Sequence, residues 1–152
     1  LHGESGATRK PRTRVSIFMK YLLDTNICIY LIRQRPASVL REMAKQQIGD
    51  VGISSVTIAE LQFGVAKSTQ PERNGAALTQ FITPLLIVDF DKPAADVYGK
   101  IRAFLEQRGT PIGSLDTLIA AHALSLDVTL VSNNVREYNR VPGLKTANWA
   151  AE

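Results

Sequence analysis

Three acidic residues, Asp24, Glu60 and Asp116, occupy positions where an ordinary solvated carboxylate is not expected. Asp24 follows the apolar run 21–23, Glu60 has apolar or small residues one helical turn away on either side, and Asp116 follows a loop that contains Gly113. Carboxylates that crowd together repel one another and raise one another's pKa. A hard divalent cation relieves this repulsion, because Mg²⁺, or Mn²⁺ in its place, takes oxygen ligands and keeps waters that a phosphate can displace. Three acids that meet in space would therefore predict metal-assisted chemistry on a phosphate group.

Each of these acids also has a simpler structural explanation. Asp24 or Asn26 would be a favourable N-cap for the helical pattern that begins at Ile27. Asp116 lies in the first turn of another helical pattern, where the helix dipole stabilises an anion. A carboxylate such as Glu60 among apolar neighbours is either poorly placed or neutralised by another group. A generic α/β domain with its acids as caps is therefore the alternative, although it requires three independent coincidences.

Short apolar runs alternate with helical patterns along the chain, which is typical of an α/β fold with a mostly parallel sheet of four to five strands. The apolar runs predict strands at 21–23, 51–54, 85–90 and 128–131, and a fifth, edge strand between 144 and 149. The helical patterns begin at 27, cover 37–47, 55–66, 71–83 and 91–107, begin again at 115, and cover 135–138. The connections between parallel strands are expected to be right-handed.

The ends of the first and fourth predicted strands bring further polar residues toward the same region. In open parallel sheets, ligands bind beyond the carboxyl ends of the strands. Asp24 follows the first strand directly, and the fourth strand is followed by Asn133, Asn134 and Glu137. If these two strands are neighbours in the sheet, we expect the groups after the fourth strand to lie near Asp24.

The 152 residues are the length of one domain, and the formal net charge of +4 is concentrated at the amino-terminal end. Residues 1–18 contain four basic residues and one acidic residue, which accounts for +3 of this total. We interpret 1–18 as a disordered basic leader, either upstream translation or a cloning remnant before Met19, and 19–152 as the folded domain. A basic arm on nucleic acid is the leader's other candidate role. Because most of the charge lies in the leader, the overall charge is no sign of a polyanionic partner of the domain.

Several function classes are disfavoured by what the sequence lacks. No apolar run approaches the roughly 18–20 residues that a membrane-spanning helix needs. Cys28 is the only cysteine, so no disulfide can form within the chain, and a reducing cytoplasm is the expected location. The chain has no glycine-rich phosphate loop, dinucleotide fingerprint or nucleophile elbow. No histidine and cysteine cluster favours zinc, and His122, within an apolar helical pattern, is predicted to be a packing residue.

Four segments, in this order, carry a resemblance to a known family. They are 22–30 with Asp24, 54–64 with Glu60, 112–122 with Asp116, and 131–138 with Asn134 and Glu137. Together they resemble the PIN-domain ribonucleases, and among these most closely the VapC toxins of bacterial type II VapBC toxin–antitoxin pairs. The resemblance extends from about Met19 to Trp149, so it covers the predicted domain and excludes the leader.

The resemblance implies a three-layer α/β/α sandwich, a homodimer, and a Mg²⁺-dependent endoribonuclease in which Mn²⁺ can substitute. It implies that the substrate is RNA, often tRNA, whose cleavage arrests translation, and that a VapB-type antitoxin occupies the catalytic groove. Operator DNA would be bound only through the antitoxin. Many relatives have an aspartate after the last core strand, where this chain has Asn133 and Asn134. The fourth active-site group is therefore either Asn134 or Glu137.

From the residues and the resemblance together we expect Asp24, Glu60, Asp116 and Glu137 to be catalytic, with the first three as metal ligands. Asp24 and Asp116 would ligate the ion directly or through its waters, and Glu60 would bind it or orient the attacking water, leaving a 5′-phosphate and a 3′-hydroxyl. Four polar residues are expected to support the carboxylates or contact the substrate, namely Thr25, Asn26, Ser114 and Asn134.

Two other functions within the same family are compatible with the sequence. One is a catalytically silent PIN-like regulator that binds DNA with an antitoxin-type partner, and the intact set of three acids disfavours it. The other is a housekeeping PIN nuclease of RNA processing that has no antitoxin. A small neighbouring gene for a DNA-binding antitoxin would distinguish a toxin from a housekeeping nuclease.

Overall fold

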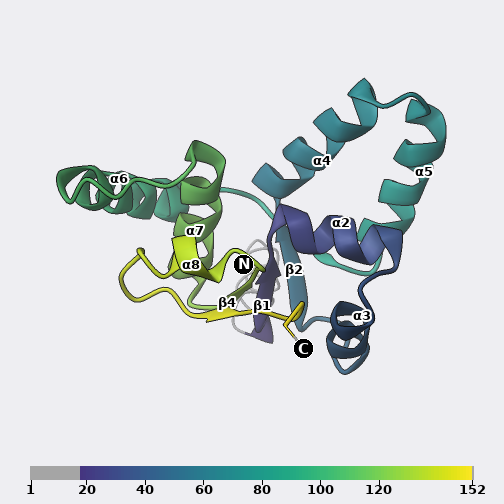
Figure 1. Ribbon diagram of the computed structural model, residues 1–152, viewed down its shortest axis with the longest axis horizontal. Coiled ribbons are helices and arrows are strands. Elements are labelled where there is room, and N and C mark those ends of the chain that lie inside the picture. Colours follow the sequence, from purple (N-terminus) through teal and green to yellow (C-terminus); the bar gives the residue numbers. More distant parts are fainter. Residues whose placement is uncertain (1–17, 152) are drawn as a thin grey trace, which may run out of the picture.

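The computed structural model describes residues 18–151. Five strands in this range form a parallel sheet in the order β3-β2-β1-β4-β5 (Figure 1). The strands are β1 (Tyr21–Leu23), β2 (Val51–Ser54), β3 (Leu86–Val88), β4 (Thr129–Val131) and β5 (Thr146–Ala147). The helices are α2 (Thr25–Arg33), α3 (Ala37–Ala44), α4 (Ser55–Lys67), α5 (Pro71–Ile82), α6 (Lys92–Gln107), α7 (Ser114–Leu126) and α8 (Val135–Tyr138). Of the leader predicted at 1–18, only Phe18 falls within the described residues. None of the helices in this part of the chain is both long and apolar enough to cross a membrane.

Helices cover both faces of the sheet, which gives the molecule three layers. Successive side chains of a strand point to opposite faces. Leu22 therefore packs with α6, α7 and α8 in a cluster that includes Ile119 and Leu130, whereas Leu23 packs with α2, α3 and α5 in a cluster that includes Ile53. In Figure 1 these two groups of helices lie to the left and right of the strands, and α4 and α5 form a V-shaped arm at the upper right. The predicted α/β/α sandwich is confirmed.

The outer strands and α3 differ most from the predicted bounds. α3 ends at Ala44 rather than at 47, and β5 covers only Thr146–Ala147 of the predicted range 144–149. β3 covers Leu86–Val88 rather than 85–90, because its pairing with β2 ends at Val88. Beyond that point the Phe90 amide donates a hydrogen bond to the Ser55 side chain at the start of α4, at 3.0 Å. The chain thus leaves the sheet early and crosses toward α6.

β1 is the central strand, and the order in which the chain places its strands reverses there. β2 and β3 are added on one side of β1, and β4 and β5 on the other. In open parallel sheets such a reversal of strand order leaves a crevice beyond the carboxyl ends of the two strands involved. Leu23 of β1 lies opposite Val131 of β4, so the first and fourth strands are neighbours, which is the condition under which the groups after β4 were expected near Asp24. Asp24 and Ser132 therefore follow adjacent strand ends at this crevice.

Gly52 in β2 is expected not to tolerate a side chain. An added Cβ would overlap the Sδ atom of buried Met19 and lie 3.2 Å from the Leu86 carbonyl oxygen. We expect Gly52→Ala to lower the free energy of unfolding by about 1–3 kcal/mol, which is the usual cost of overpacking. Gly64→Ala is the control, because no atom beyond the adjacent residues and the backbone of its own helix lies within 4 Å of its added Cβ, and this variant should be neutral or stabilised. Urea denaturation measures both variants, and equal effects would contradict the prediction.

Candidate active site

Asp24 lies at the carboxyl end of β1 and is buried, with 4% of its surface exposed. Its Oδ1 accepts a hydrogen bond from the Ile27 amide at 2.9 Å, so it caps α2 as its simpler explanation predicted. Burial raises the pKa of Asp24 from 3.8 to about 6, and the negative charges of Asp116 and Glu60 add to this rise, while hydrogen bonds from Ser132 and the Ile27 amide oppose it. Asparagine would cap the helix equally well without a buried charge. Capping therefore explains the location of Asp24 but not its carboxylate.

Glu60 lies in the second turn of α4 and is half-buried. Its Oε1 accepts a short hydrogen bond from the hydroxyl of Thr25, the residue that follows Asp24 and begins α2. Phe63, one turn farther along α4, is 65% exposed, so the surroundings of Glu60 are less apolar than its sequence neighbours suggest. The Glu60 carboxylate is thus held by a hydroxyl next to Asp24.

Asp116 is half-buried in the first turn of α7, after Gly113 at the N-cap position. The Tyr138 hydroxyl donates a hydrogen bond to Asp116 Oδ1 at 3.1 Å. The other carboxylate oxygen, Oδ2, would lie only 3.5 Å from a Cβ at Gly113, so the absence of a side chain there leaves space beside it. Burial raises the pKa of Asp116 and the charge of Glu137 adds to the rise, while the Tyr138 hydrogen bond opposes it.

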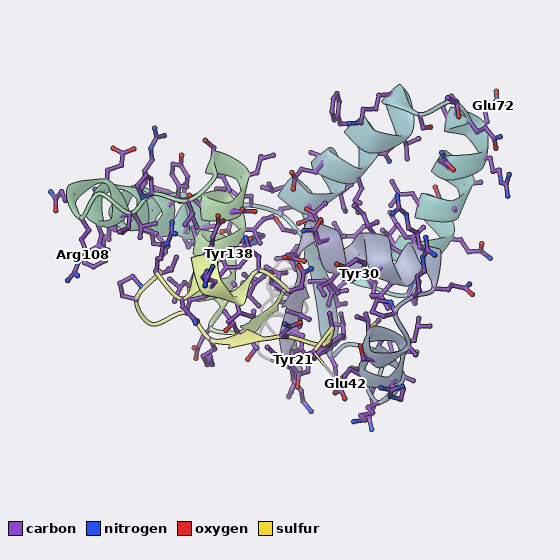
Figure 2. The ribbon with its side chains drawn as sticks, viewed as in Figure 1. Tyr21, Tyr30, Glu42, Glu72, Arg108 and Tyr138 are labelled. Atoms are coloured by element: carbon purple, nitrogen blue, oxygen red, sulfur yellow. The ribbon has the colours of Figure 1, made fainter. Side chains whose placement is uncertain are left out.

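The Tyr138 hydroxyl marks the region that the three acids share. Tyr138 comes from α8, is buried, and lies between α8 and α7 (Figure 2). Burial raises the pKa of its phenol, and the negative charges of Asp116, Asp24 and Glu60 raise it further. Carboxylates from three separate segments of the chain therefore act electrostatically on one hydroxyl at the crevice beyond β1 and β4.

The oxygen-rich donor set suits a divalent cation that keeps part of its water shell. Among residues 18–151, no three histidine, cysteine, aspartate or glutamate side chains are grouped closely enough to hold a metal ion by themselves. Mg²⁺ prefers oxygen ligands, usually keeps several waters and takes one or two carboxylates, so it does not require such a group, whereas a closed zinc site does. The repulsion that helps to raise the pKa of Asp24 is also what a bound cation would relieve. By their chemistry, though not as a preformed cluster, the carboxylates of Asp24, Glu60 and Asp116 suit a hard divalent ion.

The two candidates for the fourth group are hydrogen-bonded to each other. The Asn134 side-chain amide donates to Glu137 Oε1 at 2.9 Å. Glu137 is the one with a direct influence on the acids, because its charge raises the pKa of Asp116. Asn133, by contrast, donates to the Tyr30 hydroxyl at 2.7 Å and is exposed. Glu137 is thus the member of the pair whose charge acts on Asp116, and the Asn134 amide is hydrogen-bonded to its carboxylate.

Sequence reasoning missed two residues that contact the acids, Ser132 and Tyr138. Ser132 follows β4 directly, and its hydrogen bond opposes the rise in the pKa of Asp24. Its place at the end of a predicted strand was the available signal, whereas no spacing linked Tyr138 to its partner on α7. Of the predicted supporting residues, Asn26 and Ser114 are exposed, and Ser114 lines a pocket between α6 and α7.

His122 is a packing residue, as the sequence predicted. It is fully buried in α7, its Nδ1 lies 2.8 Å from Ser54 Oγ, and its ring meets Phe90 edge-on with centroids 5.3 Å apart. Burial lowers the pKa of His122, which favours the neutral ring. Since Ser54 caps α4, this contact joins the helix of Asp116 to the helix of Glu60.

Comparison with known proteins places this chain in a family. The PIN domain family model matches residues 21–144. The chain is 46% identical over 132 residues to the tRNA(fMet)-specific endonuclease VapC of Shigella flexneri, covering 87% of this chain and 99% of that protein. It is 47% identical over 131 residues to the ribonuclease VapC2 of Haemophilus influenzae, covering 86% and 98%. A chain in the crystal structure of VapBC2 from Rickettsia felis, bound to a DNA fragment from their promoter, matches with a TM-score of 0.78 and 44% identity, covering 86% and 99%. The chain therefore belongs to the VapC ribonucleases of the PIN-domain family.

Proposed function

We propose that this protein is a Mg²⁺-dependent endoribonuclease that acts as the toxin of a VapBC pair and arrests translation by cutting tRNA in the cytoplasm. The observation that carries the proposal is that buried Asp24 follows β1 at the carboxyl edge of the sheet, and that Thr25 next to it donates a hydrogen bond to Glu60. The charge of Asp116, which is hydrogen-bonded to Tyr138, adds to the rise in the pKa of Asp24. Similar proteins are named as a ribonuclease and as a tRNA(fMet)-specific endonuclease, which supports RNA as the substrate class and tRNA as its first candidate.

Asp24 and Asp116 would hold the cation, directly or through its waters, and Glu60 would hold it or orient the attacking water. When bound, the ion would lower the pKa of a coordinated water and offset the negative charge that develops on the scissile phosphate. Mn²⁺ should substitute for Mg²⁺, because both are octahedral ions that prefer oxygen ligands. The products would carry a 5′-phosphate and a 3′-hydroxyl.

The protein's own contribution is to hold the carboxylates in place before the substrate binds. Each acid has a hydrogen-bond donor within the fold: the Ile27 amide for Asp24, Thr25 for Glu60, and Tyr138 for Asp116. Such outer contacts fix the orientation of ligating carboxylates and reduce the entropy that binding would otherwise cost. The proposed roles of Thr25 and Asn134 are therefore to position Glu60 and Glu137, respectively.

The partners follow from the same assignment. We propose that the protein is a homodimer, that a VapB-type antitoxin inhibits it by occupying the groove at the acids, and that it reaches operator DNA only through the antitoxin. Support for an antitoxin partner and for contact with operator DNA comes from the Rickettsia felis structure, in which VapBC2 is bound to a promoter fragment.

Induced expression with and without the neighbouring antitoxin gene, followed by mapping of new RNA 5′ ends, tests the proposed function. We expect growth arrest and new tRNA 5′ ends only when the antitoxin is absent, and neither effect with the Asp116→Asn variant. New ends that do not depend on the antitoxin gene would instead indicate a housekeeping nuclease. The absence of any new end would leave no support for a nuclease.

The Glu137→Gln variant is expected to lose about 10-fold in RNA cleavage, which is less than the Asp116→Asn variant loses. Glutamine keeps the hydrogen bond with Asn134 but removes a charge that acts on Asp116. A single well-placed polar group typically contributes about 10²–10⁴-fold, and a group that acts through another contributes less. Single-turnover cleavage of one labelled tRNA measures both variants, and a larger loss for Glu137→Gln would show that Glu137 is itself a primary ligand.

A further inference from the structure

A pocket of about 200 Å³ lies between α6 and α7, is lined by residues on either side of Asp116 in the sequence, and is not formed by the three acids. Its apolar surface comes from the Tyr98 ring, buried Leu105 and half-buried Ile112. Its polar residues are Arg102, Glu106 and Ser114, which are exposed, and Thr117, which is buried. The pocket is small and mixed in character, with apolar side chains beside several donors and acceptors, so it has room for one planar ring rather than for a large ligand.

The Arg102 guanidinium at this pocket is held in place before any ligand binds. Its Nε donates to Glu106 Oε2 and its Nη1 donates to the Tyr98 hydroxyl, both at 2.9 Å. A guanidinium has five N–H donors, so these two contacts leave three donors for a ligand. A planar cation fixed beside an aromatic ring is well suited to stacking and to paired hydrogen bonds.

The pocket and the acids share the short segment that precedes α7. Ile112 and Ser114 line the pocket, and Gly113, the residue between them, is the one whose added Cβ would lie 3.5 Å from Asp116 Oδ2. A group in the pocket would therefore be separated from the Asp116 carboxylate by the backbone of a few residues. This separation is suitable for a nucleotide adjacent to the one whose phosphate is cut.

We infer that the α6–α7 pocket binds one unstacked nucleobase of the RNA, adjacent to the scissile phosphate, and contributes to the choice of the cut site. The inference rests on the proposed function. Sequence-specific recognition of RNA commonly uses unpaired bases that stack on aromatic or guanidinium planes and form hydrogen bonds along their edges. A base fits better than a phosphate, because the Glu106 carboxylate beside Arg102 repels an anion but accepts hydrogen bonds from base amino groups.

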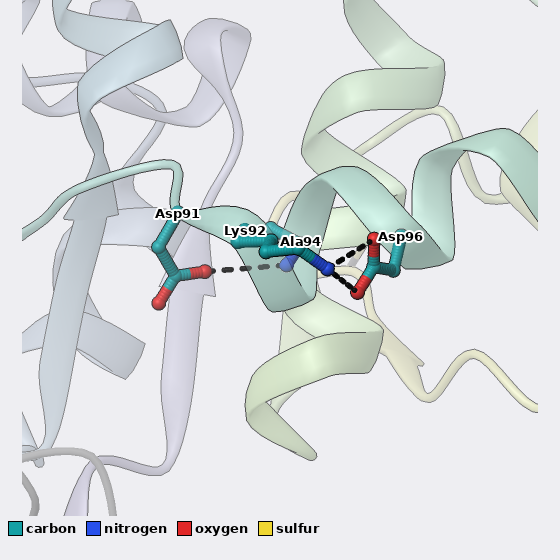
Figure 3. A network of polar contacts seen from close by, with 4 residues as sticks. All are labelled: Asp91, Lys92, Ala94 and Asp96. Atoms are coloured by element: carbon teal, nitrogen blue, oxygen red, sulfur yellow. Dashed lines mark hydrogen bonds and ion pairs between the residues drawn. The ribbon is translucent and has the colours of Figure 1, made fainter.

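Two substitutions in the pocket and one matched control test this inference. Tyr98→Leu removes the ring but keeps apolar bulk, and the double variant Arg102→Gln/Glu106→Gln removes the charged pair. The control is Lys92→Gln/Asp96→Asn. It removes an equivalent exposed i,i+4 pair, in which Lys92 Nζ lies 3.0 Å from Asp96 Oδ2 (Figure 3). This pair is at the opposite end of α6 and outside the pocket. Exposed ion pairs of this kind contribute little to stability, so both double variants should fold.

Each variant is given total tRNA and, separately, a pool of short unstructured oligoribonucleotides of randomised sequence, and the cut sites are sequenced. We expect both pocket variants to raise KM by about 10-fold, with a smaller change in kcat, and to broaden the base preference at one position beside the cut. The control should keep the wild-type KM and cut-site pattern.

The outcomes separate this inference from the proposed function. If wild-type protein cleaves RNA and the pocket variants keep its KM and cut-site pattern, the nucleobase site is refuted and the nuclease is not. If the variants lose antitoxin binding but keep normal RNA cleavage, the pocket belongs to a protein interface and the inference is again overturned. If wild-type protein cuts no RNA with Mg²⁺ or Mn²⁺, the proposed function fails first and the inference fails with it.

Discussion

The Asp24→Asn and Asp116→Asn variants are each expected to cleave RNA at least about 100-fold more slowly than the wild-type protein, because each loses a carboxylate that would hold the cation. Asparagine at either position keeps the local structure. At position 24 it still caps α2, since asparagine and aspartate are equally good N-caps. At position 116 its carbonyl oxygen can still accept the hydrogen bond from Tyr138. The loss should therefore appear in activity and not in folding.

Asp127→Asn is the matched control for both variants. Asp127 is an exposed acid at the carboxyl end of α7, in the left-handed conformation that asparagine adopts readily, and it pairs with exposed Lys145 at 3.2 Å. Cleavage of a labelled tRNA is measured under single-turnover conditions across a range of Mg²⁺ concentrations, with circular dichroism to confirm folding. Wild-type rates in either active-site variant would refute the proposed metal site, whereas the control should be unaffected.

Without metal, the wild-type protein is expected to become less stable as the pH rises from about 4 to about 6, because Asp24 is forced to ionise while buried. In the unfolded chain this carboxyl has its ordinary pKa of 3.8, and in the folded protein the pKa is about 6. Between these values the folded state binds more protons than the unfolded state, so the free energy of unfolding falls with rising pH. Above the folded pKa the loss is complete, and it is on the order of 3 kcal/mol for a shift of this size.

The Asp24→Asn variant isolates this contribution from that of the other carboxylates. Its free energy of unfolding should exceed that of the wild-type protein at pH 7 but not at pH 4, when both are measured by urea denaturation in EDTA. Added Mg²⁺ should reduce the difference at pH 7, since the cation stabilises the ionised form of Asp24 only when the carboxylate is present. The Asp127→Asn variant should follow the wild-type curve. A constant difference between wild type and Asp24→Asn at all pH values would contradict the prediction.

Most of the elements of the fold could be predicted from local pattern. The strands predicted at 21–23 and 51–54 and the short helix predicted at 135–138 have the observed bounds. The spacing of apolar residues within a segment indicates which of its faces is buried, so such segments can be predicted locally. The outer strands were less well predicted, as β3 shows. An edge strand has one partner, so its length depends on where that partner stops pairing rather than on its own sequence.

The sequence by itself identified Asp24, Glu60 and Asp116 as unusual acids, because each interrupts or ends a local apolar pattern. Only the tertiary structure decided what surrounds them. The pairing of β1 with β4 brings Ser132 to Asp24, and the packing of α8 against α7 brings the Tyr138 hydroxyl to Asp116. Local periodicity reports whether a side chain is buried, whereas contacts between distant residues depend on strand order and helix packing, which no single segment encodes.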